Sequence, residues 1–148
     1  AYLVAKAIKS AKVVGFADLG MEEKGNYTPI FNTAFTDKNE FPFTDGWLMN
    51  ADENLKCLDL PKAKAITLNK VSDSELQKQQ FVQSFNADIE TMEGAALHYV
   101  CLQEHIPFLQ IRSISNHVGE RDKTKWKIKE AIENLNKELQ ILINDLTN

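Results

Sequence analysis

The sequence has 148 residues, 43% hydrophobic and 26% charged, which is the composition of one ordinary globular domain with a packed core. Its net charge of -4 provides no broad basic surface, which argues against nucleic-acid binding as the main task. No apolar run approaches the roughly 20 residues that span a membrane, and no signal peptide opens the chain. Cys57 and Cys101 belong to no CxxC or Cys/His cluster, so we expect reduced thiols, no zinc site and a cytoplasmic protein without a membrane partner.

The first third of the chain carries few signals of regular structure. Helical spacing from Tyr2 to Ile8 begins without an N-cap residue, which suggests an interior piece of a longer protein. A short β-branched run over Lys12–Phe16 predicts a strand. The stretch from about Ala17 to Pro61 is polar and aromatic with scattered Gly, Pro, Asn and Asp, and it is predicted to be mostly loop.

The middle of the chain alternates between strand-like and helix-like segments. Lys64–Leu68 predicts a buried strand, and Ser72–Glu75 provide a capping box for a helix that ends near Phe85. Ile89–Met92 is strand-like again. Gly94–His105 then predicts a helix whose largely apolar side chains favour burial on most sides.

The last third contains the clearest elements. Phe108–Ile114 predicts a strand, and the segment after it predicts an amphipathic helix of about 20 residues. The apolar stripe of this helix consists of Ile128, Ile132, Leu135, Leu139, Leu142 and Leu146. A helix that covers the core is the commoner case, although a coiled coil fits the same pattern. The whole alternation predicts a single α/β domain over residues 1–148, with helices packed on a largely parallel or mixed sheet.

Two predicted strands end in polar residues, and ligand sites in open α/β sheets gather at such strand ends. Glu93 follows the strand over Ile89–Met92, where it is either an acid favoured by the helix dipole or a group that binds sugar hydroxyls. Arg112 lies within an apolar strand, and an unpaired buried charge is costly. We therefore expect Arg112 to pair with Glu93 on a neighbouring strand end, inside one cleft.

Two motifs in this region resemble those of the nucleoside phosphorylase and nucleosidase superfamily. Met92-Glu93-Gly94-Ala95-Ala96 is similar to its Met-Glu-x-x-Ala motif, and Arg112-Ser113-Ile114-Ser115-Asn116 to its Arg-x-Ile-Ser motif followed by Asp or Asn. The segments 16–22, 41–43, 46–48 and 116–121 look more specifically like the futalosine hydrolase branch. The resemblance implies a three-layer fold in which helices flank a mixed sheet, incomplete at the N-terminal side. It also implies hydrolysis of the N-glycosidic bond of futalosine to release hypoxanthine, a step of menaquinone biosynthesis.

The resemblance assigns roles to residues around the sugar. Met92 would pack against the ribose, and Glu93 would accept hydrogen bonds from its hydroxyls and help to hold the attacking water. Arg112 would orient Glu93. Catalysis without a metal or cofactor is implied, and the partners would be the nucleoside and, in a homo-oligomer, further copies of the chain.

Other residues would surround the purine. Ser115 would support the loop, and Asn116 would face N7 and O6 of the base. The base would be bordered by Val71, Ser72 and Asp73. His117 and Arg121 are expected near the carboxylate that futalosine carries on its sugar side, because a guanidinium binds a carboxylate with two parallel hydrogen bonds.

Position 116 bears on the choice of substrate. Nucleosidases of this superfamily that act on 6-amino purines carry Asp there, and a carboxylic acid can protonate N7 of the leaving base. Asn116 cannot supply a proton, but its NH2 group can donate to N7 or O6 of a 6-oxopurine. We therefore expect hypoxanthine, rather than adenine, to be the base. A simple turn residue before His117 is the alternative.

Several parts of the family pattern have no counterpart in this sequence. Members begin with a strand and an acidic segment whose Glu activates the water, and a Gly-rich turn later approaches the ribose. We therefore expect segments to be missing before residue 1 and near residues 10–13, with a break in the backbone between about Ile8 and Val14.

Three other functions fit the same sequence. A different purine nucleosidase, such as one acting on methylthioadenosine or adenosylhomocysteine, would use the same motifs. A non-catalytic nucleoside-binding module would keep the pocket without the acidic segment. An interaction protein built around the C-terminal helix would need neither the pocket nor the acidic segment.

Overall fold

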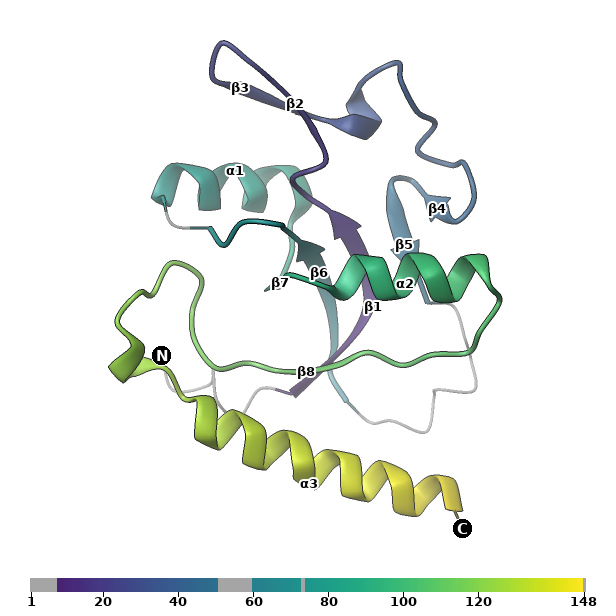
Figure 1. Ribbon diagram of the computed structural model, residues 1–148, viewed down its shortest axis with the longest axis vertical. Helices are drawn as coiled ribbons and strands as arrows, with labels where there is room; N and C mark the ends of the chain where they lie inside the picture. The colour runs from purple at the N-terminus through teal and green to yellow at the C-terminus, as the bar shows by residue number, and fades with distance from the viewer. Residues whose placement is uncertain (1–7, 51–59, 73, 148) are drawn as a thin grey trace.

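The computed structural model describes residues 8–50, 60–72 and 74–147, and a mixed sheet forms its centre (Figure 1). The strands of this sheet are β1 (Ile8–Phe16), β4 (Phe43–Thr44), β5 (Trp47–Met49), β6 (Lys62–Thr67), β7 (Ile89–Thr91) and β8 (Ile111–Ser113). Five of them follow the order β4-β5-β1-β6-β7, and β8 pairs with β1. The predicted α/β architecture with a mixed sheet is confirmed.

β1 organises the sheet because it pairs with three other strands. It is parallel to β6 and antiparallel to both β5 and β8. The register against β6 shifts between Ala11 and Val13, which marks a local irregularity in an otherwise continuous strand.

The beginning of the described chain differs from the prediction. Of the helix predicted over Tyr2–Ile8, all but the last residue lies outside the described residues, and Ile8 begins β1. The backbone break expected between Ile8 and Val14 is not found in the structure, since β1 continues through both residues. The pairing of β1 with β8 at one end and with β6 and β5 further along satisfies its backbone groups along the strand.

The stretch predicted to be mostly loop contains two hairpins. β2 (Gly20–Glu23) pairs with β3 (Asn26–Pro29), and β4 pairs with β5. A short 3-10 helix, η1 (Ile30–Asn32), lies between them. Both hairpin turns have two residues with positive φ, Lys24-Gly25 and Asp45-Gly46, and such pairs match the twist of antiparallel strands. The Asp45-Gly46 pair is the feature of the sequence from which the second hairpin could have been predicted.

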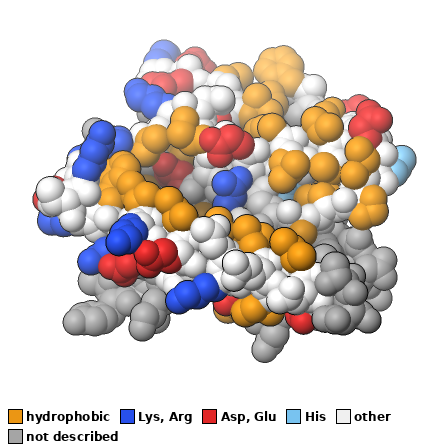
Figure 2. Space-filling model, turned by 60° about the horizontal axis from the view of Figure 1, so that its bottom comes forward, with side chains coloured by type: hydrophobic (Ala, Val, Ile, Leu, Met, Phe, Trp, Pro, Cys, Tyr) orange, Lys and Arg blue, Asp and Glu red, His pale blue; other side chains and the backbone are white. Residues whose placement is uncertain are grey.

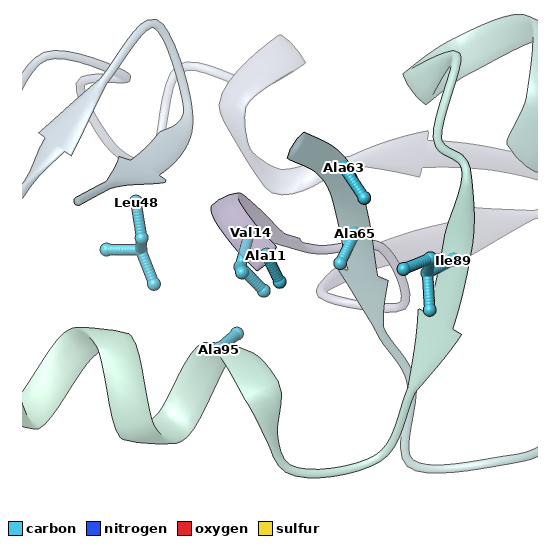
Figure 3. Packing of buried hydrophobic residues seen from close by; sticks show 7 residues of the cluster. All are labelled: Ala11, Val14, Leu48, Ala63, Ala65, Ile89 and Ala95. Carbon is cyan, nitrogen blue, oxygen red and sulfur yellow. The ribbon is translucent and has the colours of Figure 1, made fainter. Parts of the chain in front are cut away.

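Two helices cover opposite faces of the sheet. α2 (Gly94–Gln103) packs on one face, where Ala95 contacts a cluster that includes Val14 and Ala65 (Figure 3). α1 (Glu75–Phe85) packs on the other face, where Phe81 contacts Ile66. Adjacent residues of a strand point to opposite faces, so neighbouring positions of β6 serve the two helices. The result is the three-layer arrangement that the resemblance implied.

α1 ends at Phe85 as predicted, but its N-cap is Ser74 rather than Ser72 of the predicted capping box, and α2 is less buried than predicted. Ser74 caps α1 by accepting a hydrogen bond from the Gln77 amide, and the helix ends at Phe85. In α2, only Gly94, Ala95 and His98 are buried. Leu97 and Val100 remain 43% and 55% exposed, because the described residues cover only the side of α2 that faces the sheet. The expectation of burial on most sides was therefore wrong.

The predicted C-terminal helix is present as α3 (Ile128–Thr147), after the short 3-10 helix η3 (Lys123–Lys125). α3 lies against β8 at one edge of the structure (Figure 1). Its buried residues are Ala131 and Leu142, while Ile128, Ile132 and Leu139 of the predicted stripe are exposed. Among the described residues, no helix combines the length and the apolar character that a membrane crossing requires.

Candidate active site

A cleft of about 800 Å³ opens where β7 ends and where the chain leaves β8. The cleft runs along β7, at the edge of the described sheet, and is bounded by the chain after β8. It does not lie at a shared row of carboxyl ends, because β8 is antiparallel to β1 whereas β6 and β7 run parallel to it. The predicted site residues among its lining are Val71, Met92, Arg112, Ser115, Asn116, His117 and Arg121. On the face drawn in Figure 2, basic and acidic side chains lie side by side between bands of hydrophobic side chains.

The first turn of α2 is capped by two threonine hydroxyls. The Ala95 amide donates to Thr67 Oγ1 at 2.8 Å, and the Gly94 amide donates to Thr91 Oγ1 at 3.3 Å. The two hydroxyls also bond to each other at 2.9 Å. Glu93 precedes the helix, and its side chain makes no capping hydrogen bond. These amides are the ones that a capping side chain would otherwise satisfy, so the Glu93 carboxylate is not needed for this purpose.

The Glu93 carboxylate lies beside the Arg112 guanidinium. Glu93 Oε2 and Arg112 Nη1 are 3.9 Å apart, with exposed fractions of 75% and 31% for the two side chains. An ion pair so exposed adds little to the free energy of unfolding. A ligand hydroxyl can therefore approach the carboxylate without breaking a structural contact of large energy.

The predicted pairing of Glu93 with Arg112 is found, but the strands are arranged differently from the prediction. β7, which precedes Glu93, pairs with β6, whereas β8, which carries Arg112, pairs with β1. The two strands are therefore not neighbours in the described sheet. The two residues were expected on adjacent strands. Instead, the long Arg112 side chain spans the distance to Glu93.

The Asn116 amide has a defined orientation. Its Nδ2 donates to the His117 carbonyl oxygen at 3.0 Å, and Ser115 Oγ donates to its Oδ1 at 2.7 Å. A carbonyl oxygen only accepts hydrogen bonds, so the NH2 group is the end that faces it. The second hydrogen of that NH2 group is the one available for an acceptor in the cleft.

The loop before α1 is tied to β7 by a carboxylate. Glu90 Oε1 accepts a hydrogen bond from the Ser72 amide at 3.0 Å. Val71 lines the cleft, whereas the Ser72 side chain is fully buried and Asp73 lies outside the described residues. Of the two described residues, Val71 and Ser72, only Val71 lines the cleft.

The loop after β8 lines the cleft and is held by hydrogen bonds to backbone carbonyl oxygens. Arg121 Nη2 donates to the Val71 carbonyl oxygen at 3.4 Å, which joins this loop to the one before α1. The Lys127 amide donates to the Ser115 carbonyl oxygen at 2.8 Å, and Trp126 Nε1 donates to that of Glu120 at 2.9 Å. His117 is exposed at the margin of the same loop.

Several residues that hold the site from behind were not predicted from the sequence. Thr67 and Thr91 cap α2, Glu90 holds the loop before α1, and Gln110 accepts a hydrogen bond from Arg112 Nε at 3.3 Å. Gln110 stands in an apolar run, and the argument that a buried polar group needs a partner would have singled it out. Thr67 lies in a run of apolar strand residues in the same way.

The described residues include no group of three or more His, Cys, Asp or Glu side chains placed to hold a metal ion. The lining of the cleft provides the Arg112 guanidinium and the Asn116 amide, and the Glu93 carboxylate lies beside that guanidinium. Such a set can bind hydroxyls and a polar heterocycle.

The sequence is similar to a known family and to a curated relative. A family model described as the phosphorylase superfamily matches residues 10–147. A futalosine hydrolase of Thermus thermophilus is 31% identical over 105 residues, which are 71% of this chain and 45% of that protein. The chain thus spans about half the length of the curated relative that it matches.

Solved structures show the same fold. The native futalosine hydrolase of Helicobacter pylori strain 26695 has a TM-score of 0.70 at 18% identity, over 95% of this chain and 61% of that one. The apo 5'-methylthioadenosine nucleosidase of Arabidopsis thaliana has a TM-score of 0.66 at 19% identity, over 93% and 53%. The fold implied by the two sequence motifs is confirmed, and with a family match over nearly its whole length the chain belongs to the phosphorylase superfamily.

Proposed function

We propose that this protein hydrolyses the N-glycosidic bond of a purine nucleoside, and that futalosine is its substrate. The products would be hypoxanthine and dehypoxanthine futalosine. The observation that carries the proposal is the Glu93 carboxylate held 3.9 Å from Arg112, next to the cleft that Asn116 lines. The 31% identity with a protein named futalosine hydrolase supports this choice of substrate.

At the sugar, Glu93 accepts hydrogen bonds from the ribose hydroxyls and helps to hold the attacking water. Arg112 fixes the direction of the carboxylate, and Met92, 49% exposed at the cleft, packs against the ribose. Positive charge develops on the sugar as the bond to the base breaks, and a nearby carboxylate stabilises that charge. The base that deprotonates the water is assigned to no residue of the described cleft.

At the purine, the Asn116 NH2 group donates to N7 or O6. The departing hypoxanthine gains negative charge, and a donor whose orientation is set beforehand stabilises it without rearrangement. Ser115 contributes through its 2.7 Å hydrogen bond to Asn116 Oδ1, which keeps the NH2 end turned away from the Ser115 hydroxyl.

The remaining loop residues would surround the substrate. We assign the border of the base to Val71, Ser72 and Asp73, with Val71 as the side chain in contact and Ser72 acting through its backbone. His117 and Arg121 are assigned to the carboxylate on the sugar side, because both line the cleft.

The decisive experiment offers the intact protein three nucleosides: futalosine, inosine and 5'-methylthioadenosine. Chromatography of the free base should show hypoxanthine from futalosine, with kcat/KM roughly tenfold or more above that for 5'-methylthioadenosine. Glu93→Gln serves as the inactive control. Preferred cleavage of 5'-methylthioadenosine would favour the other nucleosidase function, and binding without any release of base would favour a nucleoside-binding module.

The cellular setting is also proposed. We place the protein in the cytoplasm, in menaquinone biosynthesis, and as a homo-oligomer of two or more copies. Cys101, the cysteine among the described residues, is a free thiol. The exposed Leu97 and Val100 of α2, together with Ile141 and Ile143 of α3, are apolar surface that a subunit contact would bury. Sedimentation equilibrium of the intact protein tests the oligomeric state, and a monomer would contradict it.

A further inference from the structure

Gln110 is a buried polar residue directly before β8. Its side chain is 4% exposed, and its backbone carbonyl oxygen accepts a hydrogen bond from the Ala11 amide at 2.9 Å. This backbone hydrogen bond fixes the position of the Gln110 main chain, from which the side chain extends. A buried amide must find partners for both of its ends, so the contacts of this side chain are constrained as well.

The orientation of the Gln110 amide follows from its two neighbours. Nε2 lies 3.2 Å from the Gly94 carbonyl oxygen, which only accepts hydrogen bonds. Oε1 lies 3.3 Å from Arg112 Nε, which only donates. Exchanging the two ends would place a donor against a donor and an acceptor against an acceptor. A single orientation therefore satisfies both contacts.

His98 of α2 lies beside the Gln110 amide and the Gly94 carbonyl oxygen. His98 Nδ1 lies 3.3 Å from Gln110 Nε2, and the side chain is fully buried. Burial lowers the pKa of His98 to about 4, against the opposing effect of the Gly94 and Ala11 carbonyl groups. The ring is therefore neutral at pH 7. Nδ1 accepts a hydrogen bond from Gln110 in the tautomer with its proton on Nε2, and donates to the Gly94 carbonyl oxygen, 3.2 Å away, in the other tautomer.

Gly94 makes the close approach of this amide to α2 feasible. A Cβ at position 94 would lie 2.9 Å from Gln110 Oε1 and 2.8 Å from Thr91 Oγ1. Because Gly94 has no side chain, the Gln110 amide can occupy this space.

Arg112 is oriented by Gln110. Gln110 directly precedes β8, and its side chain lies beside that of Arg112, with Oε1 3.3 Å from Arg112 Nε. With Nε bonded to Gln110, the plane of the guanidinium is fixed, and Nη1 is the atom that lies 3.9 Å from Glu93. Gln110 thereby links the first turn of α2 to the ion pair at the cleft.

We propose that Gln110 is a positioning residue, which holds the Arg112 guanidinium in the orientation that directs Glu93 toward the ribose hydroxyls. The catalytic part of this proposal rests on the proposed nucleosidase function. The structural part, a hydrogen bond that fixes Arg112, does not.

A double-mutant cycle on the intact protein tests the catalytic part. Gln110→Met keeps the volume but removes the amide, and it should lower kcat/KM for futalosine about tenfold. In an Arg112→Lys background, which lacks the Nε donor, the same change should cost less than about twofold, because the effect of Gln110 passes through that donor. Equal losses in both backgrounds would reduce Gln110 to a general packing role. Gln103→Met is the matched change in α2, where the side chain donates to the Tyr99 hydroxyl, and it should leave kcat/KM unchanged.

A second measurement is independent of any activity. The Arg112 Nε–H signal, assigned by its loss in Arg112→Lys, should exchange slowly with water in the native protein and rapidly in Gln110→Met. An unchanged exchange rate would overturn the proposal. If the native protein releases no base from futalosine, the proposed function fails, while this exchange rate still decides whether Gln110 holds Arg112.

Discussion

Arg112 and Glu93 approach within 3.9 Å although the strands that precede or carry them are not neighbours in the described sheet. The contact is made by side chains, and the backbone of each residue is held by different partners. Its strength therefore depends on how well each side chain is oriented. This is the reason that single substitutions at either position should affect catalysis more than folding.

Glu93→Gln and Arg112→Lys should each lower kcat/KM for futalosine by about a hundredfold, because each removes charge or geometry needed at the sugar. The double variant should lose much less than the product of the two, since the residues act as a pair. Release of hypoxanthine is the measurement. Glu104→Gln, at the other end of α2, is the matched control. Additive losses would show that the two residues act separately.

Asn116→Asp should move the preference from futalosine toward 5'-methylthioadenosine, because a carboxylic acid can protonate N7 and an amide cannot. The ratio of the two kcat/KM values should change by about tenfold or more. Asn136→Asp, on the exposed side of α3, controls for the added charge. An unchanged ratio in the Asn116 variant would remove this residue from substrate selection.

Gly94→Ala should lower the free energy of unfolding by about 1–3 kcal/mol, because the new Cβ would lie 2.8 Å from Thr91 Oγ1 and 2.9 Å from Gln110 Oε1. Helix propensity alone predicts the opposite sign, a gain of about 1 kcal/mol. Urea denaturation gives the measurement. The reverse change at the next exposed site of the helix, Ala96→Gly, calibrates propensity without a clash. A stabilised Gly94 variant would contradict the packing described for this turn.

His98 should make the protein less stable in acid. Its pKa is 6.5 when unfolded and about 4 when folded, so between these values the unfolded chain binds more protons. The free energy of unfolding therefore falls as the pH drops below about 6.5, by up to about 3 kcal/mol near pH 4. His98→Leu should flatten this dependence in urea titrations, whereas His117→Leu, at an exposed position, should not. Equal slopes for native protein and His98 variant would exclude His98 as the cause.

Periodicity and capping signals predicted the elements of the second half of the chain because those signals are local. α1 ends at Phe85 as expected, although it begins after Ser74 and not after Ser72, and α3 has the predicted length. The first half was predicted less well. Its hairpins are short, and both turns depend on positive φ at the residue before a glycine. The Asp45-Gly46 pair is typical of such a turn, whereas Lys24 is a residue that rarely adopts positive φ.

The candidate site also contains residues that could be predicted from the sequence and residues that could not. Glu93, Arg112 and Asn116 belong to short motifs, so their places followed from sequence order. The partners that hold them come from distant positions: Thr67 reaches α2 from another strand, and Gln110 contacts Gly94 across 16 positions. Pattern within one segment cannot reveal such pairs, because they depend on how the segments pack.

The threonine pair at the start of α2 has a consequence for how this site can change. Since Thr67 and Thr91 already satisfy the first amides of the helix, the fold sets almost no requirement on the side chain at position 93. A library randomised at position 93 alone should yield folded protein for most substitutions, whereas one randomised at position 67 or 91 should not. New chemistry could therefore be introduced at the mouth of the cleft while the helix beneath it stays intact.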